Sequence, residues 1–247
     1  MTEPIDNRVV VVTGAGSGIG RATARCFAEA GDHVLAVGRR TGPLAETAAD
    51  HRTIRPLVAD VTGDGEPERI VATALDGFGR LDVLVNNAAL AVSGALADAR
   101  RELIEPLLAT NLVAPILLAK AALPALGSGG VIVNVSTSVG QRAWPGNGVY
   151  AATKTALELL TRSWAVELAP RGIRVVAVAP GAIQTPIADH LPPDRLAELR
   201  RWQLDHTPLG RLGTAEEVAW VITRLASPSA SFVTGTVVAV DGGAVVA

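Results

Sequence analysis

The sequence is poor in cysteine, lysine and tyrosine. Among its 247 residues there is one Cys, Cys26, one Tyr, Tyr150, and only two Lys, Lys120 and Lys154. A single cysteine cannot form an internal disulfide, which fits a reducing cytosol. Cys26 falls on the apolar side of a predicted helix, so we interpret it as a core residue rather than a nucleophile.

Several classes of function lack the features that they need. The net charge is only -2 and no basic face stands out, which argues against a nucleic-acid partner. The N-terminus MTEPIDNRVV lacks the pattern of a signal peptide, and no uninterrupted apolar run reaches the roughly 18 residues of a membrane span. The four His, at 33, 51, 190 and 206, have no metal-ligand spacing. We therefore expect a cytoplasmic protein with no membrane partner and no metal site.

Seven short apolar runs alternate with helical patterns along the chain. Runs of Val, Ile and Leu between helices are typical of a parallel sheet that helices cover on both faces. We see no linker or repeat, so the sequence predicts an α/β fold in a single domain over 1–247. The predicted strands are 8–14, 33–38, 53–60, 81–87, 131–137, 173–180 and 236–243.

The stretch 186–210 interrupts this alternation with a Pro-Pro pair and a short amphipathic helix. Insertions of this length often serve as lids or binding segments. We therefore expect 186–210 to be a substrate loop.

A glycine-rich stretch, TGAGSGIG at 13–20, follows the first predicted strand. It does not fit the dinucleotide fingerprint G-x-G-x-x-G, but it fits T-G-x-x-x-G-x-G. Glycines let a phosphate approach the backbone, and a helix N-terminus favours an anion. The strand-to-helix context favours a nucleotide site over a simple tight turn.

An ordered set of motifs resembles the short-chain dehydrogenase/reductase family from about residue 8 to 243. Besides TGAGSGIG, the set is Asp60-Val61, NNAA (86–89), Asn111, YAATK (150–154), PGAIQT (180–185) and VDGG (240–243). The resemblance implies a doubly wound, seven-stranded Rossmann-like sheet and hydride transfer between a nicotinamide cofactor and a ketone or secondary alcohol. It also implies a homo-oligomer, a tetramer, which fits helices at 98–126 and 148–170 that are apolar on more than one face.

The end of the second strand predicts the type of cofactor. A carboxylate there would bind a ribose 2′-hydroxyl, but the sequence has Gly38 followed by Arg39 and Arg40. We predict NADP(H) rather than NAD(H), with Arg39 on the 2′-phosphate; the alternative is that both Arg are solvated loop residues. The resemblance places Asp60 and Val61 at the adenine, Asn87 along the cofactor, and Ile183 and Thr185 at the nicotinamide. The other implied cofactor residues are Gly14, Ser17, Gly18, Ile19, Gly20, Tyr150, Lys154, Pro180 and Gly181.

Tyr150 and Lys154 have the spacing of a proton-transfer pair. Four residues apart on a predicted helix, they share one face. A nearby ammonium should lower the phenol pKa from its usual value near 10. A core Tyr with an unrelated surface Lys is the alternative, but both residue types are so scarce that chance spacing is improbable. By resemblance, Lys154 also holds the nicotinamide ribose and Asn111 supports a water chain to Lys154, although Asn111 could be an ordinary helix-kink residue.

Three hydroxyls, Ser136, Thr137 and Ser138, are candidates for holding the substrate oxygen. In the family the corresponding Ser lies 13 residues before the Tyr and three before a Gly, and both counts give Thr137. If the strand stays regular, Thr137 faces away from its two neighbours. We predict Thr137, with Ser138 as the alternative, and a pocket narrowed by the Thr methyl group.

The substrate is less constrained. The predicted pocket residues are Arg142, Trp144, Leu191 and Trp202, which suit a medium-sized ketone, secondary alcohol or cyclic polyketide. A 3-oxoacyl-carrier reductase is the alternative, weakened because GSGG (127–130) brings no basic residue before the fifth strand. A scaffold or redox sensor that binds NADP(H) without turnover is the alternative from another class.

Overall fold

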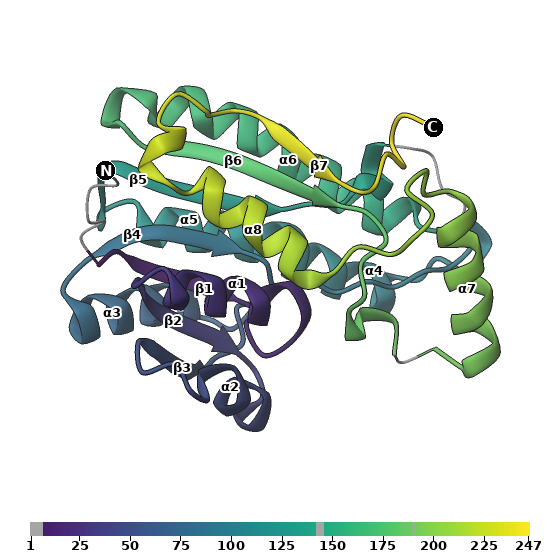
Figure 1. The fold of residues 1–247 in the computed structure, drawn as a ribbon, viewed down its shortest axis with the longest axis horizontal. Helices are drawn as coiled ribbons and strands as arrows, with labels where there is room; N and C mark the ends of the chain where they lie inside the picture. The colour runs from purple at the N-terminus through teal and green to yellow at the C-terminus, as the bar shows by residue number, and fades with distance from the viewer. Residues whose placement is uncertain (1–6, 142–145, 190) are drawn as a thin grey trace.

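One parallel sheet of seven strands organises the molecule, in the order β3-β2-β1-β4-β5-β6-β7 (Figure 1). The computed structural model describes residues 7–141, 146–189 and 191–247. The strand order, with helices on both faces of the sheet, confirms the predicted α/β class and the doubly wound sheet. The strands are β1 (Val9–Thr13), β2 (His33–Gly38), β3 (Ile54–Val58), β4 (Leu81–Asn86), β5 (Leu126–Val135), β6 (Arg174–Pro180) and β7 (Val237–Val240).

Helices cover both faces of the sheet because successive strand residues point to opposite sides. In β1, Val9 and Val11 pack with α3, α5 and α6, whereas Val10 and Val12 pack with α1, α2 and α8. The helices are α1 (Gly18–Glu29), α2 (Thr41–Ala48), α3 (Glu66–Phe78), α4 (Arg101–Leu108), α5 (Ala114–Ala122), α6 (Gly148–Leu168), α7 (Pro193–Asp205) and α8 (Ala215–Leu225). Short helical turns are η1 (Leu96–Asp98), η2 (Ala109–Val113), η3 (Ser138–Gln141), η4 (Ala169–Arg171), η5 (Pro186–Ala188) and η6 (Pro228–Ala230).

Strand β5 differs from its prediction at both ends. It begins at Leu126, which pairs with Leu81 of β4, and the next pair is Val131 with Val83. The register therefore shifts across the glycine-rich segment 127–130 of β5. It ends at Val135, so Thr137 lies beyond the strand and Ser138 begins η3. The expectation of a strand to residue 137 was therefore wrong at its last two positions.

The strand order reverses beside β1, between β1 and β4, and ligands of such sheets bind at the carboxyl ends of the strands at that point. The glycine turn follows β1, Asn87 follows β4, and Thr137 follows β5. Helix α7 lies beyond this same edge (Figure 1). The fold thus gathers segments distant in sequence along one edge.

The helical run Arg101–Ala122, from α4 through η2 to α5, is long and apolar enough to cross a membrane by length and composition alone. One such helix is weak evidence, because core helices of soluble proteins pass the same test. Here α5 packs Leu118 and Ala119 into the core beneath the sheet, and nothing in the described residues positively indicates a membrane.

Candidate active site

The glycine turn after β1 forms a close-packed cradle. Gly14 and Gly18 have φ of 66° and 50°, the left-handed region that glycine favours. A Cβ on Gly20 would collide with the Gly14 carbonyl oxygen and Asn87 Nδ2. Asn87 Nδ2 donates to Thr13 O at 2.8 Å, so the residue predicted to line the cofactor also holds the turn. Ser17 and Ile19 lie at the start of α1, where free backbone N–H groups suit a phosphate.

Arg39 and Asp60 lie together past the ends of β2 and β3. Asp60 Oδ1 accepts from Thr62 N at 3.0 Å and from Thr62 Oγ1 at 2.7 Å. The backbone N–H of Thr62 lowers the pKa of the Asp60 carboxyl, and the Thr62 hydroxyl and the Arg39 guanidinium add to this lowering. Val61 beside it is buried. Arg39 is exposed at this corner and is free to meet an anionic ligand.

The segment after β6 closes the opposite side of the cradle. Gly181 lies against Asp241, because a Cβ there would be 2.6 Å from Asp241 Cβ. A Cβ on Gly18 would be 3.1 Å from Thr185 Cγ2, so Thr185 borders the glycine turn. Pro180, the last residue of β6, accepts a hydrogen bond from Thr137 Oγ1 at 3.4 Å. The residues assigned to the two ends of a dinucleotide therefore line one continuous edge.

Helix α6 carries both members of the proton-transfer pair. Lys154 is 2% exposed, and its Nζ donates to Val135 O at 2.8 Å at the end of β5. Burial lowers the pKa of Lys154 to about 8. Burial also raises the pKa of the Tyr150 phenol, and a hydrogen bond with the Thr137 hydroxyl opposes this rise.

The expected lowering of the Tyr150 pKa by Lys154 is thus wrong for this structure. Burial disfavours the charged form of both groups, so it raises the pKa of Tyr150 and lowers the pKa of Lys154, and the two pKa values move apart. The Lys154 ammonium is instead bound to the Val135 carbonyl.

The three neighbouring hydroxyls have three different environments. Thr137 shares a hydrogen bond with Tyr150. Ser136 Oγ donates to Glu158 Oε1 at 2.7 Å. Ser138 Oγ is buried, and within the described residues it has no hydrogen-bond partner. The strand has already ended at Val135, so regular alternation does not govern these side chains. Counting back 13 residues from Tyr150 nevertheless leads to Thr137, whose hydroxyl hydrogen-bonds the Tyr150 phenol.

Asn111 lies in η2, a π-helical turn that interrupts the run from α4 to α5. Its side chain is fully buried and bonds the backbone N and O of Leu90 at 2.8 and 2.9 Å. Asn111 Nδ2 also donates to Thr153 Oγ1 at 3.2 Å, beside Lys154. Asn111 therefore lies within a distorted helical turn and connects the segment after β4 to α6. Sequence reasoning missed Leu90 and Thr153 as its partners.

The predicted substrate residues are only partly placed. Arg142 and Trp144 lie outside the described residues. Leu191 precedes α7, and Trp202 on α7 stacks on His206 with ring centroids 4.2 Å apart.

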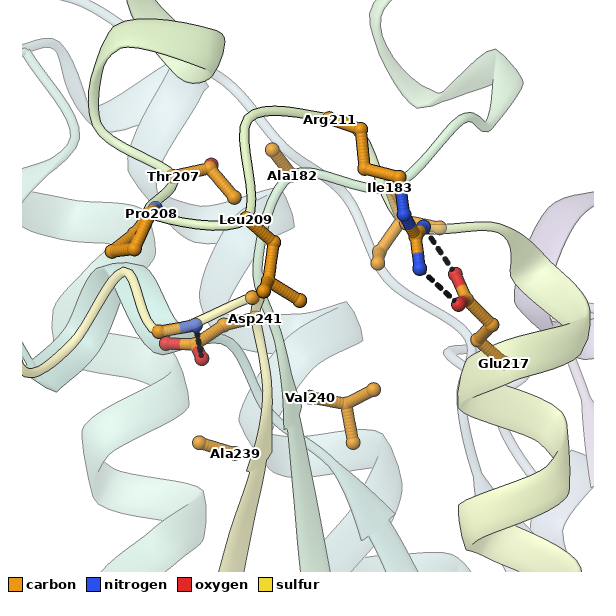
Figure 2. A pocket seen from close by; sticks show the side chains of 13 residues that line it. Ala182, Ile183, Thr207, Pro208, Leu209, Arg211, Glu217, Ala239, Val240 and Asp241 are labelled. Carbon is orange, nitrogen blue, oxygen red and sulfur yellow. Dashed lines mark hydrogen bonds and ion pairs between the residues drawn. The ribbon is translucent and has the colours of Figure 1, made fainter.

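A cavity of ≈ 470 Å³, which no sequence motif predicted, adjoins Ile183 (Figure 2). Apolar side chains such as Leu209 and Val240 line it, and the Arg211–Glu217 ion pair, at 2.6 Å, lies at its edge.

Comparisons with known proteins cover nearly the whole chain. Residues 14–245 match a family model described as enoyl-(acyl carrier protein) reductase. The chain is 38% identical to the 3-oxoacyl-(acyl-carrier-protein) reductase FabG of Thermotoga maritima, over 98% of this chain and 99% of that protein. It is 42% identical to a cis-4-hydroxycyclohexanecarboxylate dehydrogenase of Sinomonas cyclohexanicum, over 98% of both chains. A solved 3-ketoacyl-(acyl-carrier-protein) reductase of Brucella melitensis, complexed with NADH, matches with a TM-score of 0.91 and 30% identity, over 98% of this chain and 100% of that one.

Proposed function

The chain belongs to the short-chain dehydrogenase/reductase family, and from this membership we propose that it is an NADP(H)-dependent enzyme that interconverts a ketone and a secondary alcohol, with Tyr150 as the proton-transfer group. The observation that carries the proposal is the cluster of Tyr150, Thr137 and Lys154 at the carboxyl ends of β5 and β6. An oxidoreductase of this family needs an acid or base beside the cofactor, and the sole tyrosine of the chain, hydrogen-bonded to Thr137, supports Tyr150 in that role.

The residues present fit a nicotinamide dinucleotide. Gly14 and Gly18 adopt a left-handed backbone in which a Cβ would press on Asn87 or Thr185, and the turn leads into the N-terminus of α1, where backbone N–H groups suit a phosphate. The cofactor, when bound, supplies or accepts the hydride. Arg39, Thr185 and Lys154 would hold its 2′-phosphate, its nicotinamide end and its nicotinamide ribose, respectively.

Tyr150 is protonated at neutral pH, since a phenol has a pKa near 10 and burial raises the pKa of Tyr150 further. It would therefore donate its proton to a carbonyl oxygen, and we assign to the Thr137 hydroxyl the binding of that oxygen. The Lys154 ammonium is charged below its pKa of about 8, and its bond to Val135 O would leave its other donors available for the nicotinamide ribose. These protonation states favour carbonyl reduction near neutral pH and alcohol oxidation at higher pH.

The preference for NADP(H) is supported by Arg39 and by the absence of a carboxylate at Gly38. We expect Arg39→Asp to lower the NADPH/NADH ratio of kcat/KM by about 10-fold or more, since a charge-assisted hydrogen bond contributes ~1.5–3 kcal/mol. Arg40→Asp is the matched control, because Arg40 is the exposed neighbour that precedes α2. An unchanged ratio for Arg39→Asp, or an equal fall for Arg40→Asp, would remove Arg39 from this role.

A medium-sized ketone or secondary alcohol, cyclic ones included, is the substrate class that we favour, with 186–210 as the substrate loop. The half-buried Leu191 and Trp202 and the similarity to a hydroxycyclohexanecarboxylate dehydrogenase support it. The alternative, a 3-oxoacyl-carrier reductase, is favoured by the similarity to FabG.

A panel of cyclic ketones, their alcohols and a 3-oxoacyl thioester, assayed with NADPH and NADP in both directions, separates these possibilities. Higher kcat/KM on the thioester would favour the carrier reductase. NADPH binding with no turnover of any substrate would instead favour a scaffold or redox sensor.

We also propose a cytosolic homotetramer. Exposed apolar side chains gather on the helices that the sequence singled out, namely Leu103, Leu108, Val113 and Leu117 on the α4–α5 run and Leu159 and Val166 on α6. Such rows suit pairing of identical helices across a two-fold axis.

A further inference from the structure

Glu158 is a buried carboxylate that the proposed mechanism does not use. It lies on α6, four residues after Lys154 and eight after Tyr150, and is 4% exposed. The ion pairs found among the described residues do not include it. A buried carboxylate is costly unless hydrogen bonds satisfy it, and Glu158 Oε1 accepts two, from Ser136 Oγ at 2.7 Å and from Gln141 Nε2 at 3.3 Å.

The two donors flank Thr137. Ser136 directly precedes it, and Gln141 ends η3, which follows it. A single carboxylate on α6 therefore binds both ends of the segment 136–141. That same helix carries Tyr150, whose phenol shares a hydrogen bond with Thr137. The geometry of the Thr137–Tyr150 pair consequently depends on how this segment is attached to α6.

We propose that Glu158 is a positioning residue that holds the Thr137 hydroxyl against Tyr150. Its catalytic consequence rests on the proposed function, whereas its structural consequence does not. Ser136, on this account, is an anchor of the loop rather than a ligand of the substrate. The helical spacing of Tyr150, Lys154 and Glu158 is the sequence signal that could have drawn attention to this residue.

Three substitutions test the proposal by activity. Glu158→Leu removes the acceptor, and we expect kcat to fall by about 10–100-fold, somewhat less than the ~10²–10³ for loss of a positioned donor itself, with NADPH affinity little changed. Glu158→Gln keeps a carbonyl oxygen that can accept both bonds and should restore most of kcat. Thr161→Val is the matched control, because Thr161 accepts from Asn134 Nδ2 at 2.9 Å and so joins α6 to β5 away from Thr137. It should lower the melting temperature but not kcat.

A double-mutant cycle with Thr137→Val shows whether Glu158 acts through Thr137. If it does, Glu158→Leu has little further effect on kcat once the Thr137 hydroxyl is gone, because coupled residues are not additive. Full additivity, or a loss of kcat in Glu158→Leu no larger than in Thr161→Val, would overturn the proposal. If Glu158→Leu does not fold, Ser136→Ala replaces it, because it removes the donor of the same 2.7 Å bond. The same fall in kcat is then expected, and the same additivity with Thr137→Val would overturn the proposal.

A second readout needs no activity. Tyr150 is the only tyrosine, so the phenolate absorbance reports its ionisation alone. Losing the Thr137 bond should raise the Tyr150 pKa, because that bond lowers it. We expect a rise in Glu158→Leu and Thr137→Val and none in Glu158→Gln.

The direction of this titration separates positioning from charge. Loss of a negative charge near the phenol would lower the Tyr150 pKa in both Glu158 variants, and that result, or no change in Glu158→Leu, would contradict positioning. If the wild type reduces no carbonyl compound, the proposed function fails, and the titration still decides the role of Glu158.

Discussion

At the scale of single residues, the site is defined by a half-buried tyrosine and a fully buried lysine whose pKa values shift in opposite directions. Tyr150 is stabilised in its neutral form, and Lys154 loses its proton near pH 8. Enzymes place such perturbed groups where protons move, which supports the assignment. The Thr137 hydroxyl, which we propose binds the substrate oxygen, is the part of the site most open to a direct test.

We predict that Thr137→Val lowers kcat by about 10²–10³, the typical cost of losing a positioned oxyanion donor. Valine keeps the shape of the side chain, so NADPH affinity should change little. Thr137→Ser should retain activity and admit bulkier ketones, since it removes only the methyl group. Steady-state kinetics decide the matter: a nearly silent Thr137→Val together with a severely impaired Ser138→Ala would assign the role to Ser138.

Burial of Lys154 has a cost in stability that depends on pH. Its pKa falls from 10.5 to about 8, which corresponds to about 3 kcal/mol at ~1.36 kcal/mol per unit. Between these values the unfolded chain binds the extra proton, so the free energy of unfolding rises with pH.

We therefore predict that Lys154→Met abolishes most activity but is more stable than the wild type at pH 7 by about 1–3 kcal/mol, after the lost bond to Val135 O is deducted. The advantage should shrink as pH rises from 8 toward 10. Denaturant unfolding of both proteins across this range measures it, and a wild type that is more stable at pH 7 would contradict the buried, depressed lysine.

At the scale of elements, the sequence predicted the strand pattern well because most strands contain a run of Val, Ile or Leu bounded by turn residues. It predicted poorly where neighbours in space decide the structure. The register shift that begins β5 at Leu126 depends on pairing with Leu81. The π-helical turn at Asn111 depends on the backbone of Leu90, far away in sequence. The Tyr150 pKa depends on burial, which the spacing to Lys154 does not reveal.

The glycine turn gives a prediction at this scale. Ala favours helices over Gly by about 1 kcal/mol, but a Cβ on Gly20 would meet the Gly14 carbonyl and Asn87 Nδ2. The clash should dominate, so Gly20→Ala lowers both the melting temperature and the affinity for NADPH. Gly42→Ala on α2 is the control, because no atom lies within 4 Å of its Cβ position and the change should be neutral or stabilising. Thermal melts with and without NADPH measure both effects, and wild-type NADPH affinity in Gly20→Ala would contradict the prediction.

At the scale of the whole molecule, the run from α4 to α5 resembles a membrane span in composition, and this run and α6 both carry exposed apolar side chains. We predict that they are covered by other subunits. Val166 and Leu159, 78% and 64% exposed, are the clearest test positions. A Leu159→Glu, Val166→Glu double variant should show a lower mass than the wild type by light scattering. Leu75→Glu, on α3, should keep the wild-type mass, and a monomeric wild type would refute the oligomer.

The central claim is that Tyr150 transfers the proton in an NADP(H)-dependent reduction of a carbonyl compound. The most direct test compares the wild type with Tyr150→Phe on a panel of ketones, following oxidation of NADPH, with NADPH binding measured in parallel. We predict turnover by the wild type and a loss of about 10²–10⁴-fold in Tyr150→Phe, with NADPH affinity nearly unchanged. Wild-type rates in Tyr150→Phe, on any ketone that the enzyme reduces, would contradict the account.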